Sequence, residues 1–509
     1  MAKKKDLTSM RSALEWLKSE GELIEVDKEV DIIYEIAGIQ AALEGGPALR
    51  FNKLKGFPGT RDCGNVFARE KNIAKMFDVD EYKKLKFKCL EAIKHPLPPR
   101  VVKDAPCQEV VITGKKIDVL NTIPITKYHP ADAGRVLPSG NYLLTGKYTD
   151  GGTHIAFTRA TFRGKDWGAV LPSIGSTTEE ILWKFKGEKV PVTINICTPP
   201  AVLMVASAAF VHTVVPRESD KLGFAGALQG APVDIVKAKT VDAYAVANAE
   251  WVIEGYINAK ERVWESEEAE RVGRSGEVPH FQEWTGYVGT SWKAMKFEVT
   301  AITHRKEKPT FFTPFSRSID GDNMCTPFRE ACFFELAERI APGLVKDVNI
   351  LTGMAGWGAS VIFQVNKSAP RYEGYQRTVL AAAIANSFTL KMAIVVDDDV
   401  DIYSAEDILW AMTTRCNPAT GIITGAGGKV LSMMPLEKAM GGGVGVSGHR
   451  IEGCIGIDAT LPLVAQKAFP RTWYPVDRVD LKKWFTDKQL ADIRASQTGF
   501  TALWAKRGG

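Results

Sequence analysis

The sequence has few of the residues that build metal clusters and disulfide frameworks. Eight cysteines occur in 509 residues and no two form a CxxC pair, and no two of the seven histidines have helical metal-ligand spacing. Scattered cysteines argue against a zinc knuckle or a disulfide-stapled fold and favour a reducing compartment. We therefore expect a cytoplasmic protein.

Long apolar runs and a strong excess of one charge are also missing. The longest apolar stretch, residues 201–215, is interrupted by Ser207 and His212 and falls short of the ~20 residues that a membrane helix needs. The N-terminus leads into a polar segment, which predicts no signal peptide. With 65 basic and 60 acidic side chains, bulk charge does not support nucleic-acid binding. We expect neither a membrane nor a nucleic acid as partner.

Common nucleotide-binding and hydrolase motifs are absent as well. There is no GxGxxG after a predicted strand, no Walker loop, no GxSxG and no HExxH. The glycine-rich segment 441–447 lacks the Lys-Ser/Thr pair of a P-loop, so we interpret it as a loop. The three aspartates at 397–399 follow a strand-like run, and we interpret them as turn and cap residues.

The hydrophobic pattern changes twice along the chain. Residues 1–106 combine helical spacing with a strand-like run and indicate an N-terminal α/β domain. Residues 107–320 hold short strand-like runs separated by turn signals, which is typical of an antiparallel barrel. Residues 321–509 return to an α/β pattern, and the apolar run 391–396 predicts a strand buried in a parallel sheet. The predicted fold is α/β with a central β-rich barrel.

Two segments of the central region carry residues suited to acid–base chemistry. His154 and Arg159 lie on one predicted strand, on opposite faces by strict alternation. A later loop carries two carboxylates, Glu277 and Glu283. An arginine that meets a carboxylate in a barrel shifts the pKa of that carboxylate, and the two could form an acid–base pair, but the spacing alone favours a structural role for these residues. The charged segment 259–274 between them reads as a solvated loop, with gating or a subunit contact as alternatives.

Three segments give the chain a resemblance to a known family. They are Ile123–Gly134, Gly223–Gly230 and Val395–Val400. The sequence resembles the UbiD-type decarboxylases that use prenylated FMN, and the likeness extends over most of the chain. The resemblance implies an N-terminal α/β domain, a flavin-reductase-like split barrel, and a C-terminal α/β domain with the oligomerisation surface of a homodimer or homohexamer.

The resemblance also implies a reaction and its partners. The family reversibly decarboxylates aromatic or heteroaromatic acids, releases CO2, and works through a covalent flavin–substrate adduct that a carboxylic acid protonates. A flavin prenyltransferase supplies the cofactor. Two alternatives stay open within enzymes, an aryl-CoA decarboxylase and an arene carboxylase subunit, for which the basic runs 83–88 and 293–296 could bind CoA phosphates. A non-catalytic UbiD-like subunit is the alternative from another class.

The resemblance assigns roles to individual residues. Arg159 matches the arginine beside the flavin, and Glu283, which precedes Trp-Thr-Gly-Tyr, matches the proton donor. Glu277 is expected to be the second glutamate, although it stands six residues upstream of Glu283 where the family has five. The residues expected to bind the cofactor are His154, Phe157, Thr158, Arg159, Pro172, Gly175, Lys221 and Lys391.

The metal site of the family is altered in this sequence. The family holds the flavin phosphate through a divalent metal, Mn²⁺ or Fe²⁺, beside K⁺, with Asn, His and Glu as ligands. Those three positions fall on His154, Gly175 and Lys221. We therefore expect little or no help from a divalent metal, with the Lys221 ammonium in its place. If the alignment slips by one residue, Asp220 joins His154 as a ligand and a metal is retained.

Overall fold

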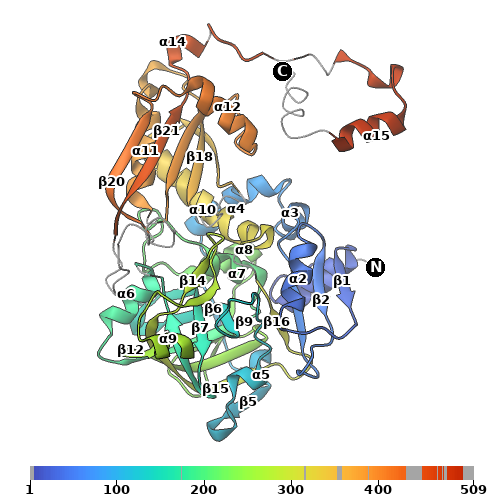
Figure 1. The fold of residues 1–509 in the computed structure, drawn as a ribbon, viewed down its shortest axis with the longest axis vertical. Helices are drawn as coiled ribbons and strands as arrows, with labels where there is room; N and C mark the ends of the chain where they lie inside the picture. The colour runs from blue at the N-terminus through green and yellow to red at the C-terminus, as the bar shows by residue number, and fades with distance from the viewer. Residues whose placement is uncertain are drawn as a thin grey trace. The chain divides into compact units, whose positions relative to one another are not determined.

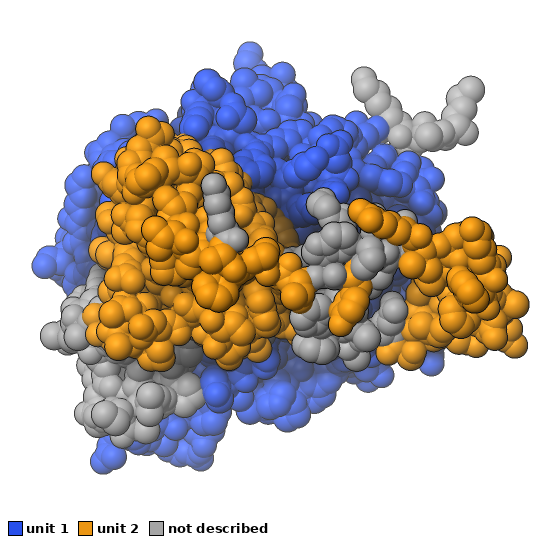
Figure 2. Space-filling view, turned by 90° about the horizontal axis from the view of Figure 1, so that it is seen from above, with its two compact units in different colours: residues 1–332, 352–358, 431–450 blue, residues 333–351, 359–430, 451–509 orange. Residues whose placement is uncertain are grey.

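The computed structural model describes the chain in two compact units (Figure 2). The described residues are 5–173, 175–314, 317–351, 358–387, 389–430, 450–466, 468–472, 474 and 478–496. The first unit holds the described residues up to 332, with Gly358 and Arg450, and the second holds the others. The segment 441–447, interpreted above as a loop, lies outside the described residues.

A four-stranded sheet and its helices form the N-terminal part of the first unit. Its elements are α1 (Met10–Ser19), β1 (Leu23–Val26), α2 (Glu35–Ala42), β2 (Ala48–Phe51), β3 (Arg61–Gly64), α3 (Glu70–Met76), α4 (Leu85–Lys94) and β16 (Thr310–Phe312). The strand order is β1-β2-β3-β16. Ser9 caps α1, whose Met10, Leu14 and Leu17 are buried, because helical spacing gathers them on one face.

A closed antiparallel barrel forms the centre of the first unit (Figure 1). Its strands are β6 (Val136–Thr145), β7 (Thr153–Phe162), β8 (Trp167–Leu171), β9 (Lys189–Ile196), β12 (Trp251–Trp264) and β15 (Lys293–His304). They follow the order β12-β9-β6-β7-β8-β15, a pairing of β12 with β15 closes the barrel, and β5 (Val110–Thr113) extends the sheet beyond β15. The predicted α/β fold with a central β-rich barrel is confirmed.

The barrel closes through an irregular pairing between β12 and β15. The register shifts between Glu254 and Gly255, and such a shift bends the strand. A Cβ atom on Gly255 would come 2.1 Å from the carbonyl oxygen of Glu298, so the two backbones approach too closely for another residue. The interpretation of residues 259–274 as a solvated loop is wrong: β12 continues into this segment, and helix α9 (Glu267–Val272) follows.

Two helices pack against strand β7. They are α7 (Pro200–Ser207) and α8 (Lys221–Gln229), and α6 (Thr177–Lys184) precedes them in the chain. Every residue of α7 is buried, so the longest apolar stretch begins as a core helix. α7 and α8 contact each other and β7, and α8 also contacts α4 (Figure 1). No helix in the described part of the chain is long and apolar enough to cross a membrane.

Some strands pair across the predicted domain boundaries. A small sheet joins β4 (Arg100–Val102), β10 (Asp234–Lys237) and β11 (Tyr244–Val246). β4 lies before residue 106 in the sequence but pairs with β10. β16 follows the barrel strands in the sequence but pairs with β3 and completes the N-terminal sheet. The division into residues 1–106, 107–320 and 321–509 stays a prediction.

The second unit is built on a five-stranded sheet. Its strands are β17 (Val345–Asn349), β18 (Ser360–Val365), β19 (Met392–Asp397), β20 (Ile422–Val430) and β21 (Arg450–Ala459), and its helices are α11 (Tyr375–Asn386), α12 (Ala405–Arg415), α14 (Leu463–Gln466), α15 (Asp487–Ser496) and the end of α10 (Ile319–Ile340). β18, β19 and β21 run parallel, and the apolar run of β19 is buried among them. Asp397 and Asp399 both accept hydrogen bonds from Arg415, which supports their structural role.

Candidate active site

Arg159 on β7 joins two carboxylates that come from different elements. Its Nε and Nη2 donate to Oε1 and Oε2 of Glu265 at 2.9 and 2.7 Å. Its Nη1 donates to Oε1 of Glu283 at 2.9 Å, and Nη2 also donates to the carbonyl oxygen of Thr290 at 3.0 Å. A planar guanidinium bonded on several sides in this way is fixed in both position and orientation.

A tight turn presents Glu283 to this cluster. The turn links β13 (Pro279–Gln282) to β14 (Val288–Thr290), which pair antiparallel. The N–H of Glu283 donates to the carbonyl oxygen of Tyr287 at 2.8 Å. The N–H of Gly286 donates to the carbonyl oxygen of Glu283 at 2.9 Å. Gly286 has a φ of 83°, which glycine adopts without strain. The Glu-Trp-Thr-Gly-Tyr sequence is therefore the turn that aims the carboxylate.

Glu265 stays charged although its side chain is fully buried. Burial alone would raise the pKa of Glu265, but Arg159 and then His280 lower this pKa below its ordinary value. Burial alone would lower the pKa of Arg159. The carboxylates of Glu265 and Glu283 outweigh this effect and raise the pKa of the guanidinium. The N–H of Trp292 donates to Oε2 of Glu265 at 2.8 Å. Arg159 and Glu265 therefore form a held, charged pair.

His280 is a neutral neighbour of this pair. Burial lowers the pKa of His280 to about 4, and Glu265 and Arg159 act on it in opposite directions. Its Nε2 lies 3.0 Å from Oγ1 of Thr161 and 3.5 Å from Oε1 of Glu265, and its Nδ1 lies 2.9 Å from Oγ of Ser291. The imidazole thus packs against Glu265 without adding a charge.

The two carboxylates on Arg159 differ in accessibility. The side chain of Glu265 is 0% exposed and that of Glu283 is 17% exposed. Arg159 carries one positive charge, which balances only one of them. Glu283 is therefore the one of the two carboxylates that solvent reaches.

The structure does not bring Glu277 into this cluster. Its side chain is 52% exposed, and its Oε1 lies 3.4 Å from Nη1 of Arg274. Glu265, which the sequence reasoning missed, takes the place on Arg159 that was expected for Glu277. The sequence around Glu265 holds several other glutamates on α9, and nothing in the pattern distinguishes the buried one.

A second buried cluster involves the other face of β7. Nζ of Lys221, the first residue of α8, lies 2.9 Å from Nδ1 of His154 and 5.5 Å from the centre of the Phe210 ring. Nε2 of His154 lies 2.8 Å from Oγ1 of Thr178 on α6. Burial, and then the charge of Arg217, lower the pKa of Lys221 to about 7. Burial and Lys221 lower the pKa of His154 well below its ordinary value, so His154 is neutral.

The remaining candidates for a metal site have other partners. Oδ1 of Asp220 caps α8 by accepting from the N–H of Gly223 at 3.3 Å, and it also accepts from the hydroxyl of Thr153. Gly175 has no side chain to offer, and its N–H donates to Glu179 at 2.5 Å. Within the described residues, no three His, Cys, Asp or Glu side chains lie together in a group that could hold a metal ion.

The other predicted cofactor-binding residues fall in several places. By alternation along β7, Phe157 shares a face with Arg159, and Thr158 shares the opposite face with His154. His154 and Arg159 are five positions apart on the strand, which corresponds to roughly 16 Å. Pro172 is buried directly after β8. Lys391 directly precedes β19 in the second unit, where its N–H donates to the carbonyl oxygen of Ala359 at 2.7 Å.

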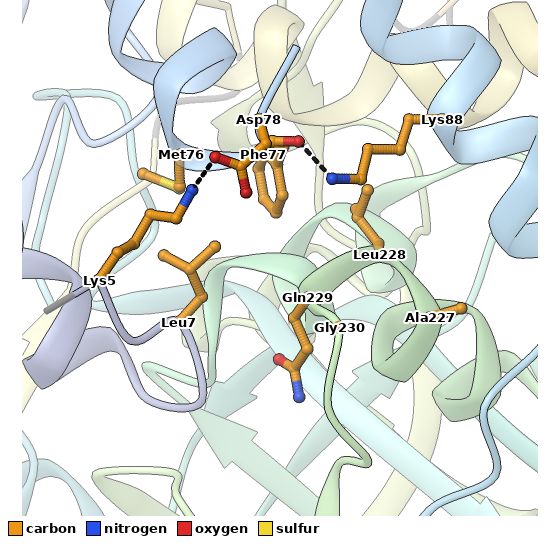
Figure 3. Close-up of a pocket in the computed structure, with 10 residues that line it drawn as sticks. All are labelled: Lys5, Leu7, Met76, Phe77, Asp78, Lys88, Ala227, Leu228, Gln229 and Gly230. Atoms are coloured by element: carbon orange, nitrogen blue, oxygen red, sulfur yellow. Dashed lines mark hydrogen bonds and ion pairs between the residues drawn. The ribbon is translucent and has the colours of Figure 1, made fainter.

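A cavity of about 150 Å³ shares no lining residue with either cluster, and Figure 3 shows the residues that line it. It is lined by Lys5, Leu7, Met76, Phe77, Asp78, Lys88, Ala227, Leu228, Gln229 and Gly230. Lys5 pairs with Asp78, and Lys88 donates to the carbonyl oxygen of Phe77. The cavity borders the last residues of α8, whereas Lys221 is the first residue of that helix. Both of its ammonium groups already have partners, so it is not the candidate site.

Comparisons with known proteins place the chain in a family. Residues 100–316 match the 3-octaprenyl-4-hydroxybenzoate carboxy-lyase Rift-related domain, residues 14–88 match the N-terminal domain, and residues 322–459 match the C-terminal domain. An uncharacterized protein in the cooM 5′ region of Rhodospirillum rubrum is 31% identical over 466 residues, which cover 89% of this chain and 92% of that protein. The chain belongs to the UbiD family of carboxy-lyases.

Other members of the UbiD family are similar over nearly their whole length. The gallate decarboxylase of Lactiplantibacillus plantarum is 29% identical over 88% of this chain and 93% of its own. The apo 3,4-dihydroxybenzoic acid decarboxylase of Enterobacter cloacae superposes with a TM-score of 0.81 at 29% identity, over 95% and 99% of the two chains. A dimeric evolved form of HmfF from Pelotomaculum thermopropionicum, in complex with prFMN, gives a TM-score of 0.78 at 26% identity, over 94% and 100%.

Proposed function

We propose that this UbiD-family protein is a prenylated-FMN-dependent decarboxylase of an aromatic carboxylic acid, with Glu283 as the proton donor. The observation that carries the proposal is the pair of carboxylates on one buried guanidinium, Arg159. One of them, Glu265, is sealed from solvent, and the other, Glu283, is accessible. Such an arrangement holds one fixed charge and one exchangeable proton, as protonation at a carbon atom requires.

The chemistry of the residues fits a flavin phosphate and a polar ring system. Lys221 is a buried cation suited to the phosphate, and Arg159 is suited to lie beside the ring. When bound, prenylated FMN supplies the electron sink that decarboxylation needs. The HmfF structure with prFMN supports this choice of cofactor, and a flavin prenyltransferase would have to supply it.

The protein residues then divide the remaining work. Arg159 orients the carboxylate of Glu283, and Glu265 orients Arg159 from the opposite side. Once CO2 has left, Glu283 gives its proton to the substrate carbon and regains one from solvent. Glu265 stays ionised throughout, because the ion pair with Arg159 holds its pKa below the ordinary value in spite of full burial. We propose Glu265 as a positioning residue, beside Arg159, where the family resemblance led us to expect Glu277 as the second glutamate.

A hydroxylated benzoic acid is the substrate class that we propose. The support comes from relatives named for gallate and for 3,4-dihydroxybenzoic acid, both at 29% identity. The CoA-thioester alternative has weaker support, since basic residues of the run 83–88 have partners of their own. Lys84 pairs with Asp80 at 3.0 Å, and the fully buried Lys86 lies 3.5 Å from Glu330.

The test is turnover by protein co-expressed with a flavin prenyltransferase. Gallate and 3,4-dihydroxybenzoate are supplied separately, with benzoate and 2-carboxybenzoyl-CoA, a thioester that keeps a free ring carboxylate, as comparison substrates. CO2 release and the aromatic product are both measured. We expect release from at least one hydroxylated acid, with one solvent deuterium incorporated at the vacated carbon when the assay runs in D2O. CO2 release from 2-carboxybenzoyl-CoA alone would establish the thioester alternative. Protein with a full prenylated-flavin spectrum that releases no CO2 from any of these acids would contradict the proposal.

A further inference from the structure

We propose that this chain holds the phosphate of its flavin through the ammonium group of Lys221, without the divalent metal that the UbiD resemblance implies. The inference rests on the proposed flavin dependence and concerns only how the phosphate is bound. It starts from a charge that the protein leaves without a counter-charge. Lys221 is 5% exposed, and among the described residues no carboxylate lies within ion-pair distance of its Nζ atom.

The side-chain nitrogen of Lys221 contacts a histidine and an aromatic ring. Its polar contact is the neutral His154, and the Phe210 ring lies on another side. Two further basic residues lower pKa values in the cluster. Arg217 lowers the pKa of Lys221, and His212 lowers the pKa of His154. Arg217 itself pairs with Glu180. A buried cation that lacks an acid is costly to the folded protein, and a bound anion removes that cost.

The hydrogen bonds of His154 leave no lone pair for a metal. When Lys221 is an ammonium it can only donate, and Nδ1 of His154 then accepts at 2.9 Å. The proton of the neutral ring is then on Nε2, which donates to the hydroxyl of Thr178 at 2.8 Å. Both ring nitrogens are occupied, whereas a metal ligand needs one free lone pair. With Lys221 charged, His154 therefore offers no free lone pair to a divalent metal.

The polar groups at the start of α8 also agree with a phosphate bound by Lys221. Asp220 uses Oδ1 to cap α8, and the N–H of Leu222 donates to the Thr153 hydroxyl at 2.9 Å, so these groups of the helix start are already bonded. The feature that points to an anion is the ammonium, which the Lys221–His154–Thr178 chain holds in place. Phosphate is the anion that a flavin mononucleotide would bring, and a lysine binds it as a point charge.

Binding of FMN and of riboflavin to the purified full-length chain tests the inference, because riboflavin lacks only the phosphate. Each ligand is titrated by flavin fluorescence into protein treated with EDTA and checked for metals by mass spectrometry, and then again with added Mn²⁺. We expect FMN to bind metal-free protein with a Kd within about twofold of its value with Mn²⁺. Lys221→Met should raise the Kd for FMN at least tenfold and leave the Kd for riboflavin unchanged. Lys184→Met, an exposed lysine on α6, is the matched control and should bind both as the unmodified protein does.

The outcomes separate this inference from the proposed function. FMN binding that disappears with EDTA and returns with Mn²⁺ would leave the flavin dependence standing and overturn the role of Lys221. Equal weakening of FMN and riboflavin by Lys221→Met, or no weakening of either, would also overturn it. If the Met variant does not fold, Lys221→Gln keeps a donor for His154 without the charge and takes its place. Failure of the unmodified protein to bind FMN under either condition would reject the flavin proposal itself, and this inference with it.

Discussion

Arg159 and Glu265 form a two-point ion pair although 106 positions separate them in the sequence. Arg159 comes from the second strand of the barrel, and Glu265 follows the strand that closes it. The pair is buried, so each side chain needs the other for its charge to be tolerated. This contact decides which acidic residue supports the candidate proton donor.

The first prediction compares two glutamates. Glu265→Gln should lower kcat by about 100-fold, because misplacing a catalytic group by about 1 Å costs that much. Glu277→Gln should lower kcat less than about twofold, since an exposed pair with Arg274 contributes little. Steady-state kinetics of both variants with the same substrate provide the measurement. The reverse order of effects would restore Glu277 to the site.

The second prediction concerns the proton donor. Glu283→Gln should lower turnover by at least about 100-fold, because the amide offers no exchangeable acid proton. Flavin binding should remain, since Arg159 keeps its pair with Glu265. Turnover and flavin content are measured on the same preparation. Turnover close to that of the unmodified protein would eliminate Glu283 as the donor.

The third prediction concerns the guanidinium itself. Arg159→Lys should reduce activity and change the visible spectrum of the holoenzyme, because a lysine cannot bond Glu265 and Glu283 with one planar group. Arg159→Ala should also destabilise the fold by about 3–5 kcal/mol, since it leaves a buried carboxylate unpaired. Absorbance spectra and urea unfolding check the two parts. A spectrum unchanged in both variants would remove Arg159 from the cofactor site.

The fourth prediction uses the space beside Glu283. A Cβ atom on Gly289 would lie 2.6 Å from Oε1 of Glu283, so Gly289→Ala should push the carboxylate away from Arg159. We expect kcat to fall by about 100-fold while flavin binding is kept. Gly187→Ala is the control, because a Cβ atom there meets nothing within 4 Å. Equal activity of the two variants would show that Glu283 tolerates the displacement.

The fifth prediction concerns the pH dependence of stability. Burial raises the pKa of Asp320 to about 7, above its unfolded value near 3.8, so the folded protein prefers this group protonated. Its stabilising effect is present below pH 4 and is lost as pH rises toward 7, which costs the folded state up to about 4 kcal/mol. Asp320→Asn keeps the acceptor for the N–H of Phe67 and should raise Tm at pH 8 but not at pH 4. Thermal unfolding at the two pH values decides, and an equal shift at both would refute the assignment.

Much of the architecture is readable from local patterns. Helical spacing over residues 10–17 and the apolar run of β19 both predict elements that the structure contains, because burial of apolar side chains follows the period of each element. The Glu-Trp-Thr-Gly-Tyr turn is a local signal too, since Gly286 supplies the positive φ that the turn needs. Such features depend on neighbours within a few residues.

Which charged residues gather around Arg159 depends on contacts between residues far apart in the sequence, and no local sequence pattern predicts them. Glu265 and Glu277 both stand among other charged residues, and only the path of β12 buries one while the other stays exposed. Strict alternation predicted that His154 and Arg159 lie on opposite faces of β7. It could not predict that Lys221 and Thr178 contact the side chain of His154. The sequence by itself predicted the central β-rich barrel, and the family resemblance pointed to Arg159. Tertiary structure decided which charges are buried together, because the electrostatic cost of burial depends on partners brought from distant parts of the chain.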